Sequence, residues 1–147
     1  MSFSLENPEA TILVVVDEAA FRKLLKVNLE RSGGYSLLLA EDGQDALHMA
    51  HDHKGKIDLL VSDLQMAGMT GVDLAKELRR ARPEMRIMLT SAYPQGLLIL
   101  HSGWTFLQKP YLPSTILDSV REVLIAPSAA PKATVVKRPA LVPVGGS

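Results

Sequence analysis

The sequence predicts an α/β protein whose strands form a doubly wound, mostly parallel sheet. Two observations support this fold class. Five short apolar runs alternate with segments of helical periodicity, and four of these runs end next to a polar or charged residue. Strands that alternate with helices pair in parallel through right-handed crossovers. The runs are almost continuously apolar, as expected for strands that helices cover on both faces.

The first half of the chain contributes two strands and two helices to this prediction. Ile12 to Val16 is apolar and mostly β-branched, which favours a central strand. The helix that follows has an acidic start and stops at Gly33-Gly34, a typical helix end. Residues 35–40 form a second short strand, and Asp42-Gly43 turns into a helix over about 44–52.

The second half repeats the alternation. The expected elements are a strand ending at Asp63, a helix over 72–82 before Pro83, a strand over 86–91, a short apolar segment over 96–100, a strand over 105–108, and a helix from Pro113. The last of these has the clearest amphipathic pattern, with apolar residues at three- and four-residue steps.

The chain is expected to hold one domain between two extensions. Residues 1–10 form an N-terminal extension and residues 11–125 the domain, whose length is enough to bury a sizeable core. Residues 126–147 are rich in proline and alanine and lack periodicity, so we expect a disordered tail.

The composition argues against several classes of function, including nucleic-acid and membrane binding. Lysine plus arginine equals aspartate plus glutamate at 16 each, so no net charge favours nucleic acid or a membrane surface. The chain has no cysteine, no signal peptide pattern and no apolar stretch of the ~20 residues that a spanning helix needs. We therefore expect a soluble, cytoplasmic protein without a membrane partner.

Four residues near strand ends could form one site. They are Asp17, Asp63, Ser91 and Lys109. Each alone means little, since a carboxylate after a strand is often a helix cap, but parallel strands bring their C-terminal ends to one edge of the sheet. Two carboxylates suit a hard cation such as Mg²⁺, and a lysine ammonium and a hydroxyl suit phosphoryl oxygens. An aspartate can itself be the nucleophile once a metal offsets charge repulsion.

At these positions the sequence resembles the receiver domain of two-component response regulators, over about Thr11 to Ile125. The matching motifs are ILVVVDE, SDLQMAGMTG, LTSA and LQKPY, in the family's order. The resemblance implies a flavodoxin-like fold with a five-stranded sheet of order 2-1-3-4-5.

The resemblance also implies roles for individual residues. Asp63 would be the phosphoacceptor and Lys109 the partner of the phosphoryl group. Asp17, Asp63 and the backbone carbonyl of Gln65 would be the protein ligands of Mg²⁺. The bond between Lys109 and Pro110 is expected to be cis, as is usual in the family.

The switch hydroxyl is either Thr90 or Ser91. The family places a small residue directly after it, and Ala92 follows Ser91, so we favour Ser91. The aromatic residue coupled to it would be Phe106, for which simple core packing is an alternative that does not exclude the coupling.

Of the departures from the family pattern, two bear directly on the site and the fold. Val16 stands where the first of two adjacent acidic residues is usual, so we expect weaker metal binding. The interval from Ser91 to Lys109 is about one helical turn shorter than usual, which predicts a shortened fourth helix.

The resemblance leads to two expectations for function. The first is a single-domain response regulator that accepts a phosphoryl group on Asp63 from a histidine kinase or phosphotransfer protein and then acts on a downstream protein target. It would be a phosphoacceptor that assists its own phosphorylation and dephosphorylation rather than an enzyme. The alternative, motivated by Val16, is a pseudo-receiver that binds partners without phosphorylation. No DNA-binding motif follows Ile125, so direct DNA binding is not expected.

Overall fold

A single parallel sheet forms the centre of the molecule. The structure is a computed structural model that describes residues 10–92, 104–125 and 134–136. The strands are β1 (Thr11–Val15), β2 (Ser36–Ala40), β3 (Leu59–Asp63), β4 (Arg86–Ser91), β5 (Trp104–Gln108) and β6 (Thr134–Val136). They lie in the order β2-β1-β3-β4-β5-β6, and every neighbouring pair is parallel.

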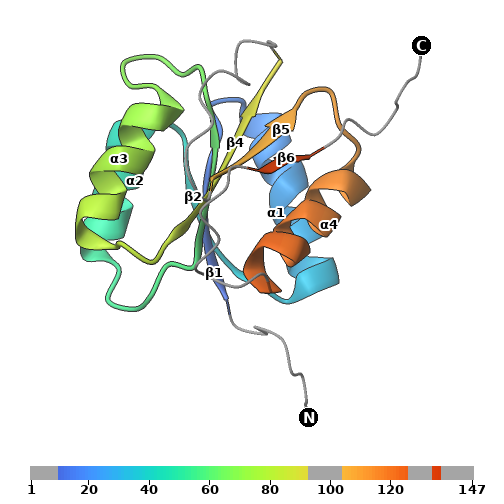
Figure 1. Cartoon of the computed structure of the whole chain (residues 1–147), viewed down its shortest axis with the longest axis horizontal. Coiled ribbons are helices and arrows are strands. Elements are labelled where there is room, and N and C mark those ends of the chain that lie inside the picture. The colour runs from blue at the N-terminus through green and yellow to red at the C-terminus, as the bar shows by residue number, and fades with distance from the viewer. Residues whose placement is uncertain (1–9, 93–103, 126–133, 137–147) are drawn as a thin grey trace.

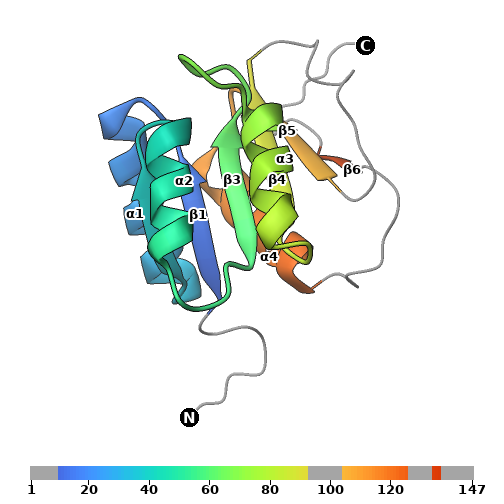
Figure 2. The same ribbon diagram turned by 90° about the vertical axis from the view of Figure 1, so that its left-hand side faces the viewer.

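Helices cover both faces of this sheet. The helices among the described residues are α1 (Ala19–Gly33), α2 (Gly43–Asp52), α3 (Gly71–Ala81) and α4 (Pro113–Ile125). Figures 1 and 2 show α2 and α3 side by side on one face, with α1 and α4 on the other. The C-terminal ends of the parallel strands therefore share one edge, between the two helical layers.

The core consists of two layers because successive strand residues point to opposite faces. Leu13 and Leu60 pack with α2 and α3, whereas their neighbours Val14 and Val61 pack with α1 and α4. The apolar side chains of the central strands β1 and β3 that point to either face are almost completely buried. Each such side chain contributes about 1.5–3 kcal/mol through the burial of apolar surface.

Local signals set the helix ends. The side chains of Asp42 and Thr70 cap α2 and α3 by accepting a hydrogen bond from the backbone N–H three residues later, at 2.8 and 3.1 Å. Gly34 ends α1 in the left-handed conformation, with φ 68°, and its N–H donates to the Glu30 carbonyl.

The predicted five-stranded order 2-1-3-4-5 is confirmed. One strand was not predicted: β6 lies within residues 126–147, which we expected to be disordered, and that expectation is wrong for residues 134–136. These three residues, Thr-Val-Val, are all β-branched, and they pair with the open side of β5. The apolar segment 96–100 and the shortened fourth helix lie outside the described residues.

Candidate functional site

The four residues singled out from the sequence lie at one edge of the sheet. Asp63 is the last residue of β3 and Ser91 the last of β4, while Lys109 directly follows β5. Asp17 lies two residues beyond the end of β1. The fold therefore brings all four to the C-terminal edge, as the alternation of strands and helices predicted.

Asp63 is the centre of the site. Its side chain is 7% exposed, and the Lys109 ammonium lies 2.9 Å from its Oδ1 atom. The Thr90 hydroxyl also contacts Oδ1, at 2.7 Å. Within the described residues, Oδ2 takes part in no hydrogen bond or ion pair. Two donors thus hold one carboxylate oxygen, and the other is left for a ligand or a reacting atom.

Lys109 reaches Asp63 because the chain turns sharply after β5. The peptide bond between Lys109 and Pro110 is cis, as expected. The backbone N–H of Lys109 donates to the Ser91 carbonyl at 2.8 Å, which continues the pairing of β4 and β5 by one residue. The ammonium also lies 5.6 Å from the centroid of the Phe21 ring, within the range of a cation–π interaction.

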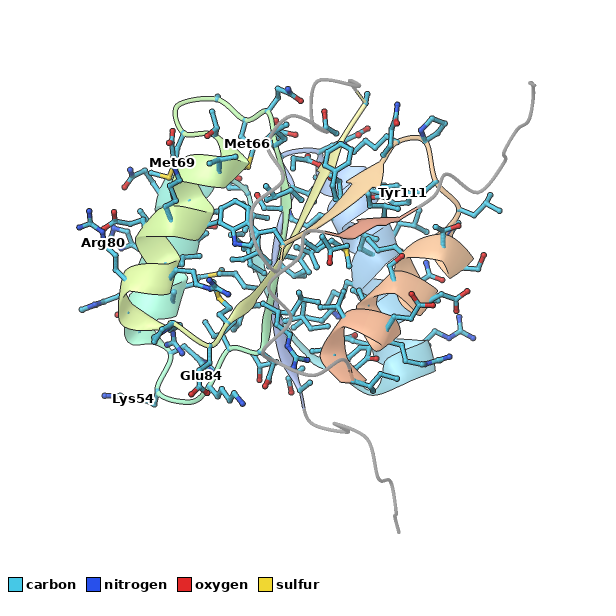
Figure 3. The ribbon with its side chains drawn as sticks, in the orientation of Figure 1. Lys54, Met66, Met69, Arg80, Glu84 and Tyr111 are labelled. Carbon is cyan, nitrogen blue, oxygen red and sulfur yellow. The ribbon has the colours of Figure 1, made fainter. Side chains whose placement is uncertain are left out.

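Tyr111 adds a second hydroxyl to this side of the site. Its ring packs against Phe21, with centroids 5.8 Å apart, and its hydroxyl lies close enough to the Thr90 side chain to interact with it. Figure 3 shows Tyr111 on the α1–α4 side of the sheet, with Met66 and Met69 on the other side. Burial raises the pKa of the Tyr111 hydroxyl and the Asp63 charge raises it further, whereas the hydrogen bond that Thr90 can donate to an ionised Tyr111 lowers it.

Sequence reasoning gave Tyr111 and Phe21 no role. Tyr111 lies within the LQKPY motif, in which the resemblance implies a role only for the lysine and the cis bond to the proline. Its position two residues after Lys109 is the signal that could have drawn attention to it. Phe21 lies at an apolar position of the first predicted helix, and nothing local in the sequence distinguishes it from core packing.

The two candidate switch hydroxyls have different partners. Thr90 contacts Asp63, whereas the Ser91 hydroxyl donates to the Gln65 side-chain oxygen at 2.9 Å. Both residues are buried, but they alternate along β4 and so face opposite sides of the sheet. The assignment of Ser91 as the switch hydroxyl stays a prediction, and Thr90 is the hydroxyl in contact with the candidate phosphoacceptor.

Phe106, the candidate switch aromatic, is buried in the core. It packs in the layer beneath α2 and α3, the same layer that contains Leu89 of the neighbouring strand. Core packing, the simpler of the two roles considered for this residue, is therefore observed. A coupling to Ser91 stays a prediction.

The site has fewer acidic side chains than the family pattern provides. Asp17 is exposed, and Val16 before it is only 2% exposed and packs in the core. No group of three or more acidic or histidine side chains gathers within the described parts of the chain. The oxygen donors that remain, Asp17 and the open Oδ2 of Asp63, still match the preference of Mg²⁺ for oxygen ligands.

The loop after β3 is held tightly against the site. The Gly71 N–H donates to the Leu64 carbonyl at 2.8 Å, which closes the loop that contains Gln65. A Cβ atom at Gly71 would overlap the carbonyl oxygen of Asp63. Glycine at this position therefore lets the loop backbone pass directly beside the residue that carries the carboxylate.

The chain matches a known family over most of its length. The model of the response regulator receiver domain matches residues 12–121. Sensor kinase CckA of Brucella abortus is 33% identical over 119 residues, which are 78% of this chain but 12% of CckA. The transcriptional regulatory protein PhoP of Bacillus subtilis is 34% identical over 117 residues, 77% of this chain and 48% of PhoP. The chain thus spans less than half the length of these two relatives.

Solved structures agree with this result. The crystal structure of the receiver domain from the hybrid histidine kinase CckA has a TM-score of 0.67 and 37% identity, and covers 78% of this chain and 99% of that one. The chemotaxis protein CheY4 of Vibrio cholerae has a TM-score of 0.68 and 26% identity, over 79% and 99%. The chain belongs to the receiver domain family of two-component response regulators. Within the described part of the chain, none of the helices has the length and apolar character needed to span a bilayer.

Proposed function

We propose that this receiver domain accepts a phosphoryl group on Asp63 from a histidine kinase or phosphotransfer protein. One observation carries the proposal: the Asp63 carboxylate is nearly buried, with Oδ1 held by Lys109 and Thr90 and with Oδ2 without a hydrogen-bond partner among the described residues. Oδ2 attacks the donor phosphorus, the bond from phosphorus to the donor breaks, and the electron pair leaves with the donor. Lys109, close to the same carboxylate, then pairs with a phosphoryl oxygen.

Mg²⁺ would be held by Asp17, Asp63 and the Gln65 carbonyl. When bound, it offsets the repulsion between the carboxylate and the incoming phosphoryl group. Val16 supplies no carboxylate to this set, and a lost partner that acts through water costs ~1–2 kcal/mol, by analogy with outer-shell ligands of other metals. We therefore propose metal-dependent phosphorylation with reduced metal affinity.

Phosphorylation would act through a shift between two conformations. Ser91 leaves Gln65 and approaches the phosphoryl group, and Phe106 follows it. The new charge favours the second conformation only through contacts that differ between the two states. The altered surface would be recognised by a downstream protein, and we propose a cytoplasmic location for the exchange.

Intact-mass measurement tests this proposal. The protein is incubated with a small-molecule phosphodonor such as acetyl phosphate and with saturating Mg²⁺, beside an Asp63→Ala variant. The proposal expects a phosphoryl adduct in the first sample and none in the second. A wild-type protein without an adduct counts against it.

The alternative, a pseudo-receiver that binds partners without phosphorylation, is favoured by one observation: the buried Val16 in place of an acid. In that case no Mg²⁺ binding is detected up to tens of millimolar, while a partner still binds. Isothermal titration with Mg²⁺ distinguishes the two functions, because the first requires a measurable metal affinity.

A further inference from the structure

Two hydroxyl side chains lie in series with the Asp63 carboxylate: Thr90 is hydrogen-bonded to Asp63, and Tyr111 interacts with Thr90. The carboxylate can only accept, so the Thr90 hydroxyl donates its one proton to Oδ1. Thr90 then has no proton left for Tyr111, so while Tyr111 is neutral a hydrogen bond between the two hydroxyls can only be donated by Tyr111. As long as Tyr111 keeps its proton, the direction is therefore Tyr111 to Thr90 to Asp63.

Thr90 is well placed to keep this contact during a reaction at Asp63. The two residues face each other in the register of β3 and β4, and both are at most 5% exposed. The backbone N–H of Leu64 also donates to the Thr90 carbonyl at 2.8 Å. Lys109 differs, since its side chain is long, 32% exposed and able to follow a phosphoryl group.

We propose that Thr90, oriented by Tyr111, stabilises the Asp63 carboxylate as it is released from the phosphoryl group and so shortens the lifetime of the aspartyl phosphate. This inference rests on the proposed phosphorylation of Asp63. Thr90 is a catalytic residue in this scheme, because it touches the reacting group. Tyr111 is a positioning residue that acts only through Thr90.

The chemistry of hydrolysis shows why Thr90 should shorten the lifetime of the aspartyl phosphate rather than lengthen it. A water oxygen forms a bond to phosphorus, the bond between phosphorus and Oδ2 breaks, and the water proton passes to solvent. The electron pair of the broken bond returns to the carboxylate, where Oδ1 shares the charge. In the aspartyl phosphate Oδ1 is a neutral carbonyl oxygen, so the bond from Thr90 strengthens as charge develops. An interaction that is stronger in the transition state accelerates the step.

The same bond opposes phosphorylation. It stabilises the free carboxylate more than the phosphorylated form, so its removal favours the phosphorylated form. A variant that lacks the Thr90 hydroxyl should therefore hydrolyse more slowly and be phosphorylated no more slowly. General damage to the site would instead slow phosphorylation, which separates the two explanations.

The experiment follows the decay of the phosphorylated full chain by intact mass after removal of acetyl phosphate. The variants are Thr90→Val, Tyr111→Phe, the double variant and Thr90→Ser, which keeps a hydroxyl. Tyr111→Phe retains the ring that packs on Phe21. Matched controls are Thr105→Val, a buried threonine of β5, and Tyr35→Phe, at the opposite end of the sheet.

We expect Thr90→Val to lengthen the lifetime about tenfold, the effect of one hydrogen bond to a charged group, or ~1.4 kcal/mol. Tyr111→Phe should lengthen it about two- to threefold. The double variant should match Thr90→Val alone, because Tyr111 has no effect without Thr90. Thr90→Ser and both controls should stay near the wild-type lifetime.

Several outcomes would overturn the inference. A Thr90→Val lifetime equal to or shorter than that of the wild type contradicts the role of Thr90. Additive effects of Thr90→Val and Tyr111→Phe contradict action in series. If the wild type takes no phosphoryl group at all, the proposed function fails and this inference fails with it. If the wild type is phosphorylated but the Thr90 and Tyr111 variants keep its lifetime, only this inference is contradicted.

Discussion

At the scale of single residues, Asp63 and Val16 define what the site can do. Asp63 is held through one carboxylate oxygen, by Lys109 at 2.9 Å and Thr90 at 2.7 Å, and its other oxygen has no hydrogen-bond or ion-pair partner among the described residues. Val16 is buried and carries no charge. The site therefore has a carboxylate nucleophile held in a defined position, but one carboxylate fewer to hold a metal.

The substitution Val16→Asp should restore part of the metal site. A carboxyl group buried at this position without a partner costs at least ~1–3 kcal/mol of stability in the absence of metal, since a charged group costs more than a neutral one. Bound Mg²⁺ should reverse that loss, with an affinity about tenfold above the wild-type value. Thermal unfolding with and without Mg²⁺ measures both effects, with Val27→Asp as the same change at an exposed helix position. Equal Mg²⁺-dependent shifts in Val16→Asp and wild type would contradict the assignment of this site.

Tyr111 should make stability depend on alkaline pH. Its pKa is raised in the folded state, first by burial and then by the Asp63 charge, above its ordinary value of 10.0. The unfolded chain therefore loses the Tyr111 proton first as pH rises. Stability from this group is complete below pH 10.0 and falls as the pH rises through the folded pKa. Urea unfolding between pH 8 and 11 should show a smaller loss in Tyr111→Phe than in wild type. A loss of the same size in the two proteins would show that Tyr111 makes no such contribution.

At the scale of elements, strand β3 and the loop that follows position the reactive carboxylate. The loop from Leu64 closes on the Gly71 N–H at the start of α3, and the Thr70 side chain caps that helix. The loop passes so close to β3 that only glycine fits at position 71. The helix and the nucleophile are thus joined by a backbone contact that a side chain would break.

Gly71→Ala should consequently destabilise the protein. Its Cβ would meet backbone atoms of Asp63 and Leu64, which cannot rotate away, and relief of such overpacking typically costs 1–3 kcal/mol. Gly55→Ala is the control, because its nearest neighbour is the end of the His53 side chain at 3.3 Å. Chemical denaturation compares the two. Equal stabilities would mean that the loop can shift without cost.

Much of each element was predictable from the sequence, and the exceptions have physical causes. Continuous apolar runs identified β1, β3 and β4, since strands buried on both faces tolerate few polar residues. The contact of Thr90 with Asp63 was not predictable, because it depends on the register of two strands. The roles of Phe21 and Tyr111 depend in the same way on the packing of α1 against the turn after β5.

At the scale of the whole molecule, the parallel sheet determines where chemistry can occur. All strands end at one edge, so residues as distant in sequence as Asp63 and Lys109 become neighbours. Strand β6 was missed because three residues in a stretch rich in proline and alanine give no periodic pattern. It lies beside β5, whose edge would otherwise leave backbone groups unpaired.

Removal of residues 126–147 should expose that edge. The β5 amides that face β6 lie within residues 105–107 and should exchange with solvent faster in the truncated chain. Val135→Pro in the full chain should act in the same direction, because proline donates no hydrogen bond. Hydrogen exchange of this segment, with β1 as an internal reference, measures the effect. Identical exchange in all three proteins would contradict the pairing of β6 with β5.

The central claim, that Asp63 receives the phosphoryl group, is tested most directly by locating the modified residue. Borohydride reduction of the phosphorylated protein converts an aspartyl phosphate to homoserine, and peptide mass spectrometry then identifies the position. We predict homoserine at residue 63, only in protein treated with both phosphodonor and Mg²⁺. Modification at any other residue, or an adduct that persists in Asp63→Ala, would contradict it.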